Sequence, residues 1–209
     1  MPNMYIISGC NGSGKTTTSY SLLPDLLDCR QFVNSDEFAK SLSPFNPSAA
    51  SLKAGRFMLR KLYYLMSRGE TFSVETTLAT RALIKIIHKA QAQGYTVTIL
   101  YFWLSSPQMA IDRVHKRVAA GGHDIAEEVI KRRYYMGLDY LFNYYLPACD
   151  NWILADNTVA PFKVIAQGAR GEAPIVRDSK TFGIIKTITL SAKKLSEENS
   201  MISEEEAQE

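Results

Sequence analysis

The sequence has few cysteines and no long apolar run. Its three cysteines, Cys10, Cys29 and Cys149, are odd in number and show no paired spacing, so neither a disulfide framework nor a zinc site is indicated. The longest apolar run, Ile99 to Leu104, is far too short to cross a bilayer. The N-terminus also lacks the basic segment of a secretory signal. These absences together predict a cytoplasmic protein.

Basic side chains outnumber acidic ones except near the C-terminus. Residues 197–209 contain six glutamates and no lysine or arginine. The preceding 196 residues therefore hold 24 basic and 15 acidic side chains, a net charge of +9, against +3 for the whole chain. A basic body favours an anionic partner, either phosphorylated metabolites or nucleic acid. We predict one domain over 1–190, followed by a disordered acidic tail over 191–209.

A phosphate-binding motif lies near the N-terminus. The stretch from Gly9 to Thr16 fits the pattern G-x-x-x-x-G-K-[ST]. The apolar run from Met4 to Ser8 is expected to form a buried strand before it, and a helix that offers free N–H groups to an anion is expected after it. Lys15 is expected to reach the β- and γ-phosphates of ATP, and the Thr16 hydroxyl to bind Mg²⁺. The predicted nucleotide-binding residues of the loop are Gly9, Asn11, Gly12, Ser13, Gly14, Lys15, Thr16 and Thr17.

Strand and helix patterns alternate along the rest of the chain. The intervening segments have helical periodicity, and Pro24 is expected to end the first helix, which begins at Thr16, after Leu23. The alternation predicts an α/β fold, a three-layer sandwich in which helices cover a mostly parallel five-stranded sheet. A small β-hairpin is expected over about 161–178. The four strands predicted after the first are Gln31–Asn34, Thr71–Glu75, Tyr95–Leu104 and Trp152–Ala155.

Polar side chains follow two of the predicted strands. Asp36 comes just after the second strand, and Glu75 and Thr76 stand at the end of the third. The carboxyl ends of parallel strands face the ligand crevice, so these side chains are expected near the phosphates. For Asp36, position alone leaves a second interpretation open, in which Ser35 or Asp36 only caps the following helix.

An arginine-rich pair of helices is predicted over about 113–135. Arg113 and Arg117 are four residues apart and therefore share one helix face. A Gly-Gly loop interrupts the helix before Arg132 and Arg133. We interpret this region as a lid that closes over phosphates, the alternative being a surface hairpin with ordinary exposed arginines. Arg56, in the predicted helix of residues 49–67, is a further candidate to point into the cleft.

Six stretches of the chain, in order and in spacing, resemble the zeta toxin family of P-loop kinases, in particular its single-domain bacterial branch. The resemblance runs from residue 3 to about 157 and does not include the hairpin or the tail. It implies a kinase that uses ATP and Mg²⁺ to phosphorylate a sugar hydroxyl of UDP-N-acetylglucosamine, and a small antitoxin protein as a partner. The stretches are 9–17, 32–37, 42–47, 54–56, 75–78 and the lid from Arg117 through 121–124 to Arg132 and Arg133.

The resemblance also implies roles for individual residues. Lys15 would stabilise the transferring phosphoryl group, Asp36 would accept the proton of the sugar hydroxyl, and Thr16 and Asp36 would share the metal directly or through water. Glu75 would bind the substrate or order the site, with Arg56 and Thr76 on the same acceptor side. The predicted lid arginines are Arg117, Arg132 and Arg133, which would clamp the phosphates, and Arg113, which would stack on adenine as in nucleoside monophosphate kinases, which this region also resembles.

Two alternative functions remain open from the sequence. The first is a kinase for another acceptor, such as a nucleoside monophosphate, a sugar, an antibiotic hydroxyl or a polynucleotide end. The second is a non-catalytic, nucleotide-dependent module that binds nucleic acid through the basic body, with a steep dependence on salt. The basic residues fall mostly on the lid and on one helix, which phosphate chemistry already explains.

Overall fold

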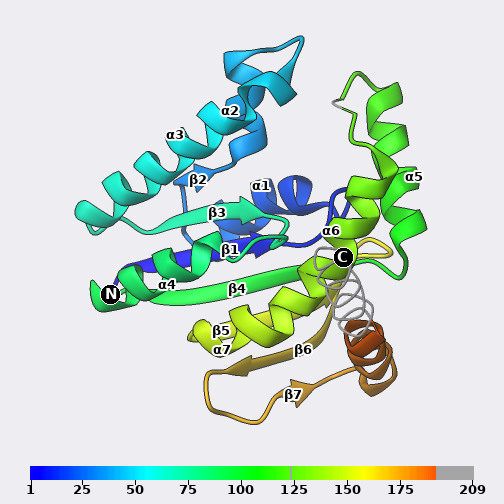
Figure 1. Cartoon of the computed structure of the whole chain (residues 1–209). Helices are drawn as coiled ribbons and strands as arrows, with labels where there is room; N and C mark the ends of the chain where they lie inside the picture. Colours follow the sequence, from blue (N-terminus) through cyan, green and yellow to red (C-terminus); the bar gives the residue numbers. More distant parts are fainter. Residues whose placement is uncertain (123, 192–209) are drawn as a thin grey trace, which may run out of the picture.

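A computed structural model of the chain describes residues 1–122 and 124–191 (Figure 1). The prediction of a disordered tail lies outside the described residues except at Ser191. No helix in the described ranges is long and apolar enough to cross a membrane. The elements are β1 (Asn3–Ser8), α1 (Lys15–Leu26), β2 (Phe32–Val33), α2 (Ser35–Leu42), α3 (Pro47–Ser67), β3 (Phe72–Thr76), α4 (Ala82–Ala92), β4 (Thr96–Trp103), α5 (Pro107–Ala119), α6 (Glu127–Tyr140), the π-helix η1 (Leu141–Tyr145), α7 (Leu146–Ala148), β5 (Asn151–Asp156), β6 (Lys163–Ala169), β7 (Ile175–Val176) and a helix over 179–191.

The strands form one sheet in the order β2-β3-β1-β4-β5-β6-β7. The first five are parallel, which confirms the predicted α/β class. The prediction of a five-stranded sheet with a separate hairpin is wrong, because β6 and β7 extend the same sheet in antiparallel pairing. The physical reason lies in β5, which would otherwise be an open edge with unpaired N–H and C=O groups. β6 covers that edge along the whole of β5, from Asn151↔Ala169 to Asp156↔Lys163.

Side chains of β1 alternate between the two faces of the sheet, as expected for a strand that is buried on both sides. Met4 and Ile6 belong to the larger apolar cluster, whereas Ile7 packs with Leu23 of α1 in a smaller one. Figure 1 accordingly shows α1 on the opposite face of the sheet from α4 and α6. The larger cluster also includes side chains from three helices, Leu62 of α3, Ile87 of α4 and Leu138 of α6.

Two helices differ from the predictions. The prediction that Pro24 ends the first helix is wrong, because α1 continues through Pro24 to Leu26. A proline there removes the N–H that would bond to the carbonyl of Tyr20, but Tyr20 is 65% exposed, so water can satisfy that carbonyl. The helix over 179–191 was not predicted. Its Phe182 and Ile185 are buried in the larger cluster, and this packing stabilises the helix.

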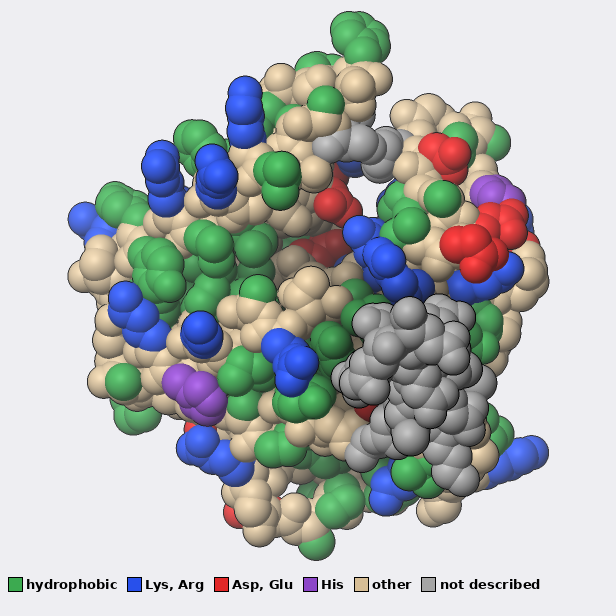
Figure 2. All heavy atoms as spheres, viewed as in Figure 1, with side chains coloured by type: hydrophobic (Ala, Val, Ile, Leu, Met, Phe, Trp, Pro, Cys, Tyr) green, Lys and Arg blue, Asp and Glu red, His purple; other side chains and the backbone are tan. Residues whose placement is uncertain are grey.

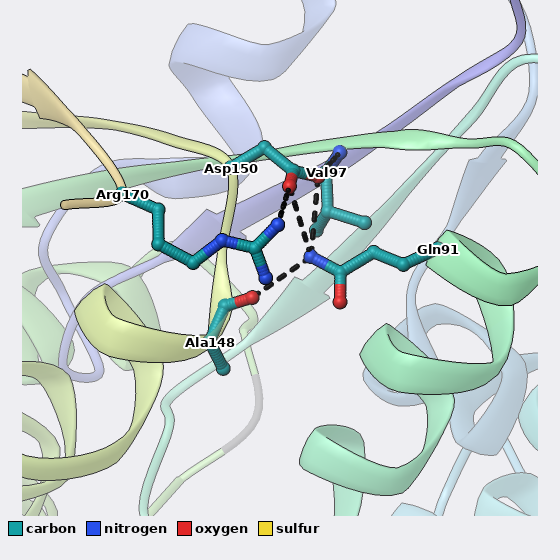
Figure 3. A network of polar contacts seen from close by, with 5 residues as sticks. All are labelled: Gln91, Val97, Ala148, Asp150 and Arg170. Carbon is teal, nitrogen blue, oxygen red and sulfur yellow. Dashed lines mark hydrogen bonds and ion pairs between the residues drawn. The ribbon is translucent and has the colours of Figure 1, made fainter.

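Asp150 ties four elements together at the amino end of β5 (Figure 3). Its carboxylate accepts hydrogen bonds from Val97 N of β4 at 2.8 Å and from Arg170 Nη2, after β6, at 2.7 Å. Gln91 Nε2 of α4 also reaches this carboxylate, at 3.2 Å, and donates to Ala148 O of α7 at 2.8 Å. This network lies at the amino end of the sheet, opposite the predicted phosphate loop. Its role is therefore to hold the C-terminal strands in place and not to contact a ligand.

Candidate functional site

The predicted phosphate loop leaves the carboxyl end of β1, the middle strand of the parallel part of the sheet. There Ser8 is paired with Thr76 of β3 and Tyr101 of β4. Gly12 has a φ of 75°, and a Cβ at this position would lie 2.6 Å from the carbonyl oxygen of Ala110 in α5. Glycine is therefore required both for its positive φ and for the close approach of the loop to α5.

Lys15 points back over the phosphate loop. Its Nζ donates a hydrogen bond to the carbonyl oxygen of Cys10 at 2.8 Å, and its side chain is buried. A buried ammonium group with a single short hydrogen bond to the loop is placed to meet an anion held by the loop. Thr17, the last predicted loop residue, is exposed on α1.

Glu75 lies beside the loop at the end of β3, paired with Ile7 of β1. The Thr16 hydroxyl donates to Glu75 Oε2 at 2.8 Å. Burial raises the pKa of the Glu75 carboxyl, and the nearby Asp36 and Glu37 raise it further. The charge of Lys15 and the Thr16 hydroxyl bond oppose these effects. Three carboxylates, the loop lysine and the loop threonine therefore lie within reach of one another electrostatically.

Asp36 begins the first turn of α2, but it does not cap that helix. Asn34 is the N-cap residue, and its Oδ1 accepts hydrogen bonds from Asp36 N at 2.8 Å and Glu37 N at 3.4 Å. The interpretation of Ser35 or Asp36 as the cap is therefore wrong, and the carboxylate of Asp36 is exposed to the cleft side chains. The sequence analysis missed Asn34, although asparagine directly before a helix is a typical cap signal.

Arg133 is the lid arginine that reaches the phosphate loop. Its Nη1 donates to Asn11 Oδ1 at 3.1 Å. Burial lowers the pKa of Arg133, the charge of Asp36 opposes that shift, and the neighbouring Arg132 adds to it. Arg132 itself is exposed on α6. The structure therefore distinguishes two adjacent arginines that the sequence leaves equivalent.

The remaining predicted site residues lie further from this cluster. Arg113 Nη2 donates to the carbonyl oxygen of Thr158, after β5, at 2.7 Å, and Arg117 is exposed near the end of α5. Arg56 is exposed on α3. The Thr76 hydroxyl accepts a bond from Leu78 N at 3.1 Å and so shapes the turn after β3.

Figure 2 shows a hollow between the α2–α3 arm and the α5–α6 pair, with Asp and Glu side chains inside it and Lys and Arg side chains on the α5–α6 side. The residues described above account for these charges. Asp36 and Glu75 stand at the ends of neighbouring elements on one side, and Arg133 approaches from the other. The hollow therefore separates carboxylates from cations across the mouth of the phosphate loop.

Asn157 is a site residue that the sequence analysis missed. It follows β5 directly, and its Nδ2 donates to the carbonyl oxygen of Ser13 in the phosphate loop at 2.7 Å. The available signal was its position, since residues just past a parallel strand face the same crevice.

Replacing Glu75 with glutamine is expected to stabilise the protein at pH 8. The folded state raises the pKa of this carboxyl mainly by burial, so the charged form costs stability above that pKa, and the cost disappears as the carboxyl is protonated. We expect a melting temperature about 2–4 °C above that of the unmodified protein, roughly 1 kcal/mol, at pH 8. The difference should shrink as the pH falls toward 4. Melting curves between pH 8 and pH 4 measure both effects, and a Glu75→Gln variant that melts earlier at pH 8 would contradict the prediction.

The sequence matches the AAA_33 family, described as an AAA domain, over residues 4–134. A curated protein of Haemophilus influenzae, described as uncharacterized, is 32% identical over 126 residues, which make up 60% of this chain and 88% of that protein.

Two solved structures show the same fold. The complex AvrRxo1-ORF1:AvrRxo1-ORF2 with sulphate ions has a TM-score of 0.71 at 18% identity over 90% of this chain. This chain spans only 64% of the length of that one. A structure from the PezAT chromosomal toxin-antitoxin system of Streptococcus pneumoniae has a TM-score of 0.65 at 13% identity, over 93% of this chain and 86% of that one. The resemblance to the zeta toxin family is thereby confirmed at the level of the fold.

Proposed function

The chain belongs to the AAA_33 family, and from the geometry of its cleft we propose that it is a kinase that transfers the γ-phosphoryl group of ATP to a hydroxyl group. One observation carries the proposal. Side chains from α1, α2, β3 and α6 converge on the phosphate loop, with carboxylates on one side and a half-buried arginine on the other. Phosphoryl transfer needs this arrangement, cations on the transferring group and a base beside the acceptor.

Each residue has a distinct task in the proposed reaction. Lys15 and Arg133 stabilise the negative charge of the transferring phosphoryl group. Asp36 accepts the proton of the acceptor hydroxyl as its oxygen forms a bond to the γ-phosphorus and the bond to ADP breaks. Asp36 suits this role better than Glu75, because Glu75 is buried and already accepts the hydroxyl bond of Thr16.

Mg²⁺ fits the donors at this site. Among the described residues there is no group of three or more His, Cys, Asp or Glu side chains that could hold a metal ion by themselves. Mg²⁺ usually binds through one or two protein oxygens together with substrate phosphates and water. The Thr16 hydroxyl would hold it together with Asp36 or Glu75, directly or through water. The ion would neutralise charge on the phosphates when bound.

We propose UDP-N-acetylglucosamine as the acceptor and a small antitoxin as a protein partner, on the strength of the motif resemblance. Support for ATP comes from the fold shared with an AvrRxo1-ORF1:-ORF2 structure with ATP, and support for the antitoxin from the fold shared with the PezAT structure.

The test of the acceptor is direct. Purified protein is incubated with ATP, Mg²⁺ and UDP-N-acetylglucosamine, and mass spectrometry measures a product heavier by one phosphoryl group, with Lys15→Ala as the inactive control. ATP hydrolysis that needs Lys15 but yields no such product would retain the kinase and reject this acceptor. A screen of monophosphates, sugars, antibiotics and polynucleotide ends would follow. Nucleic-acid binding that weakens steeply with salt, without any transfer, would instead favour the binding-module alternative.

A further inference from the structure

The contact between Asn157 and the phosphate loop fixes one peptide group of that loop. Asn157 Nδ2 donates to Ser13 O at 2.7 Å, and a Cβ on Gly14 would lie 2.6 Å from the same nitrogen. Gly14 also has a φ of 82°. The amide of Asn157 therefore occupies the space that only glycine leaves open at position 14.

The orientation of this peptide group decides what the loop presents to an anion. In a planar trans peptide, the C=O of Ser13 and the N–H of Gly14 point in opposite directions. With the carbonyl held toward Asn157, the Gly14 N–H points to the other side, which is the side of the loop that binds the anion. Glycine permits both orientations of the peptide, so its backbone alone does not select one of them.

Asn157 is itself held in a rigid segment. Its backbone N–H donates to Trp103 O of β4 at 2.9 Å. Thr158 N donates to Asp156 Oδ1 at 2.8 Å, and Thr158 Oγ1 accepts a bond from Ser105 N at 3.2 Å. The side chain of Asn157 therefore extends from a segment fixed to β4 and to the start of α5, which limits its freedom to follow a flipping peptide.

We propose that Asn157 is a positioning residue that selects the anion-binding orientation of the Ser13–Gly14 peptide. It acts through the loop and not by touching the transferred group. The inference rests on the proposed function only in that the loop binds the phosphates of ATP. It makes no use of the acceptor.

The test is the affinity of the full chain for ATP and for inorganic tripolyphosphate, measured by calorimetry. In Asn157→Asp, an ionised carboxylate cannot donate to Ser13 O and repels it, so both affinities should fall by at least about tenfold, with a smaller loss in Asn157→Ala. Asn151→Asp places the same substitution at the exposed amino end of β5 and should change neither affinity. Thermal melting of each variant reports whether it is folded, and Asn157→Ala serves if Asn157→Asp is not.

A pH series separates this role from a purely structural one. When the introduced carboxyl is protonated, its O–H can donate to Ser13 O, so tripolyphosphate binding by Asn157→Asp, relative to the unmodified protein, should recover as the pH falls from 8 to 5. Equal tripolyphosphate affinity in both proteins at pH 8 would overturn the proposal. A loss confined to ATP would also overturn it, because Asn157 would then contact the base.

Discussion

Asparagine at position 36 is expected to reduce phosphoryl transfer by at least about 100-fold while it leaves ATP affinity within about threefold. The Asp36 carboxylate lies at the start of α2 and acts electrostatically on both Glu75 and Arg133. It therefore faces the point where acceptor and phosphate meet. Asparagine keeps the size and the local backbone but cannot accept a proton. Single-turnover transfer and nucleotide binding, measured separately, test the two halves of this expectation.

The matched control for Asp36 is its neighbour. Glu37→Gln removes an equal charge from the same helical turn, but Glu37 forms an exposed ion pair with Lys40 at 3.0 Å. Successive residues on a helix point about 100° apart, so Glu37 is directed away from the position that Asp36 occupies. We expect a change in turnover of less than about threefold in Glu37→Gln, as for surface charges. Near-normal turnover in Asp36→Asn, or equal losses in both variants, would show that Asp36 is not the base.

Alanine at position 133 is expected to lower the transfer rate by about 10²–10³-fold, the effect typical of a cation removed from a transferring phosphoryl group. Arg133 is half-buried, donates to Asn11 of the phosphate loop and faces Asp36. Its position brings a positive charge from α6 to the loop, where the phosphate charge develops. Stopped-flow transfer assays at saturating ATP isolate this effect from nucleotide binding.

Arg132→Ala provides the matched control for Arg133. The two residues are adjacent and identical in chemistry, but Arg132 is exposed. We expect a loss of less than about fivefold for Arg132→Ala, since an exposed cation is screened by water and salt. Melting temperatures should be similar in both variants, because burial already lowers the pKa of Arg133 and so opposes its charge. A larger loss in Arg132→Ala than in Arg133→Ala would contradict the assignment.

Much of the site was predictable because its signals are local. The spacing of Gly9, Gly14 and Lys15 identifies the phosphate loop, and apolar runs locate the five parallel strands. The rule that strand ends face the crevice then places Asp36 and Glu75 near the loop. These predictions depend on backbone conformation and burial periodicity, which neighbouring residues largely determine.

Other features depend on contacts between distant parts of the chain. The hydrogen bond from Thr16 to Glu75 joins residues 59 positions apart, and that from Asn157 to Ser13 joins residues 144 apart. The sequence gives no sign of either, since an asparagine after a strand is common. Likewise, the hairpin of β6 and β7 reads as a separate element until its first strand is seen to pair with β5.

The sequence by itself determined the phosphate loop, the α/β class and the set of charged residues near the nucleotide, because each follows from short patterns of glycine, charge and apolar spacing. Only the tertiary structure decided that Arg133 and not Arg132 reaches the loop, that Asn34 frees Asp36 from capping, and that Asn157 holds Ser13. The reason is geometric. Helix rotation and the packing of separate elements determine which of several similar side chains enters the cleft, and no local pattern encodes that choice.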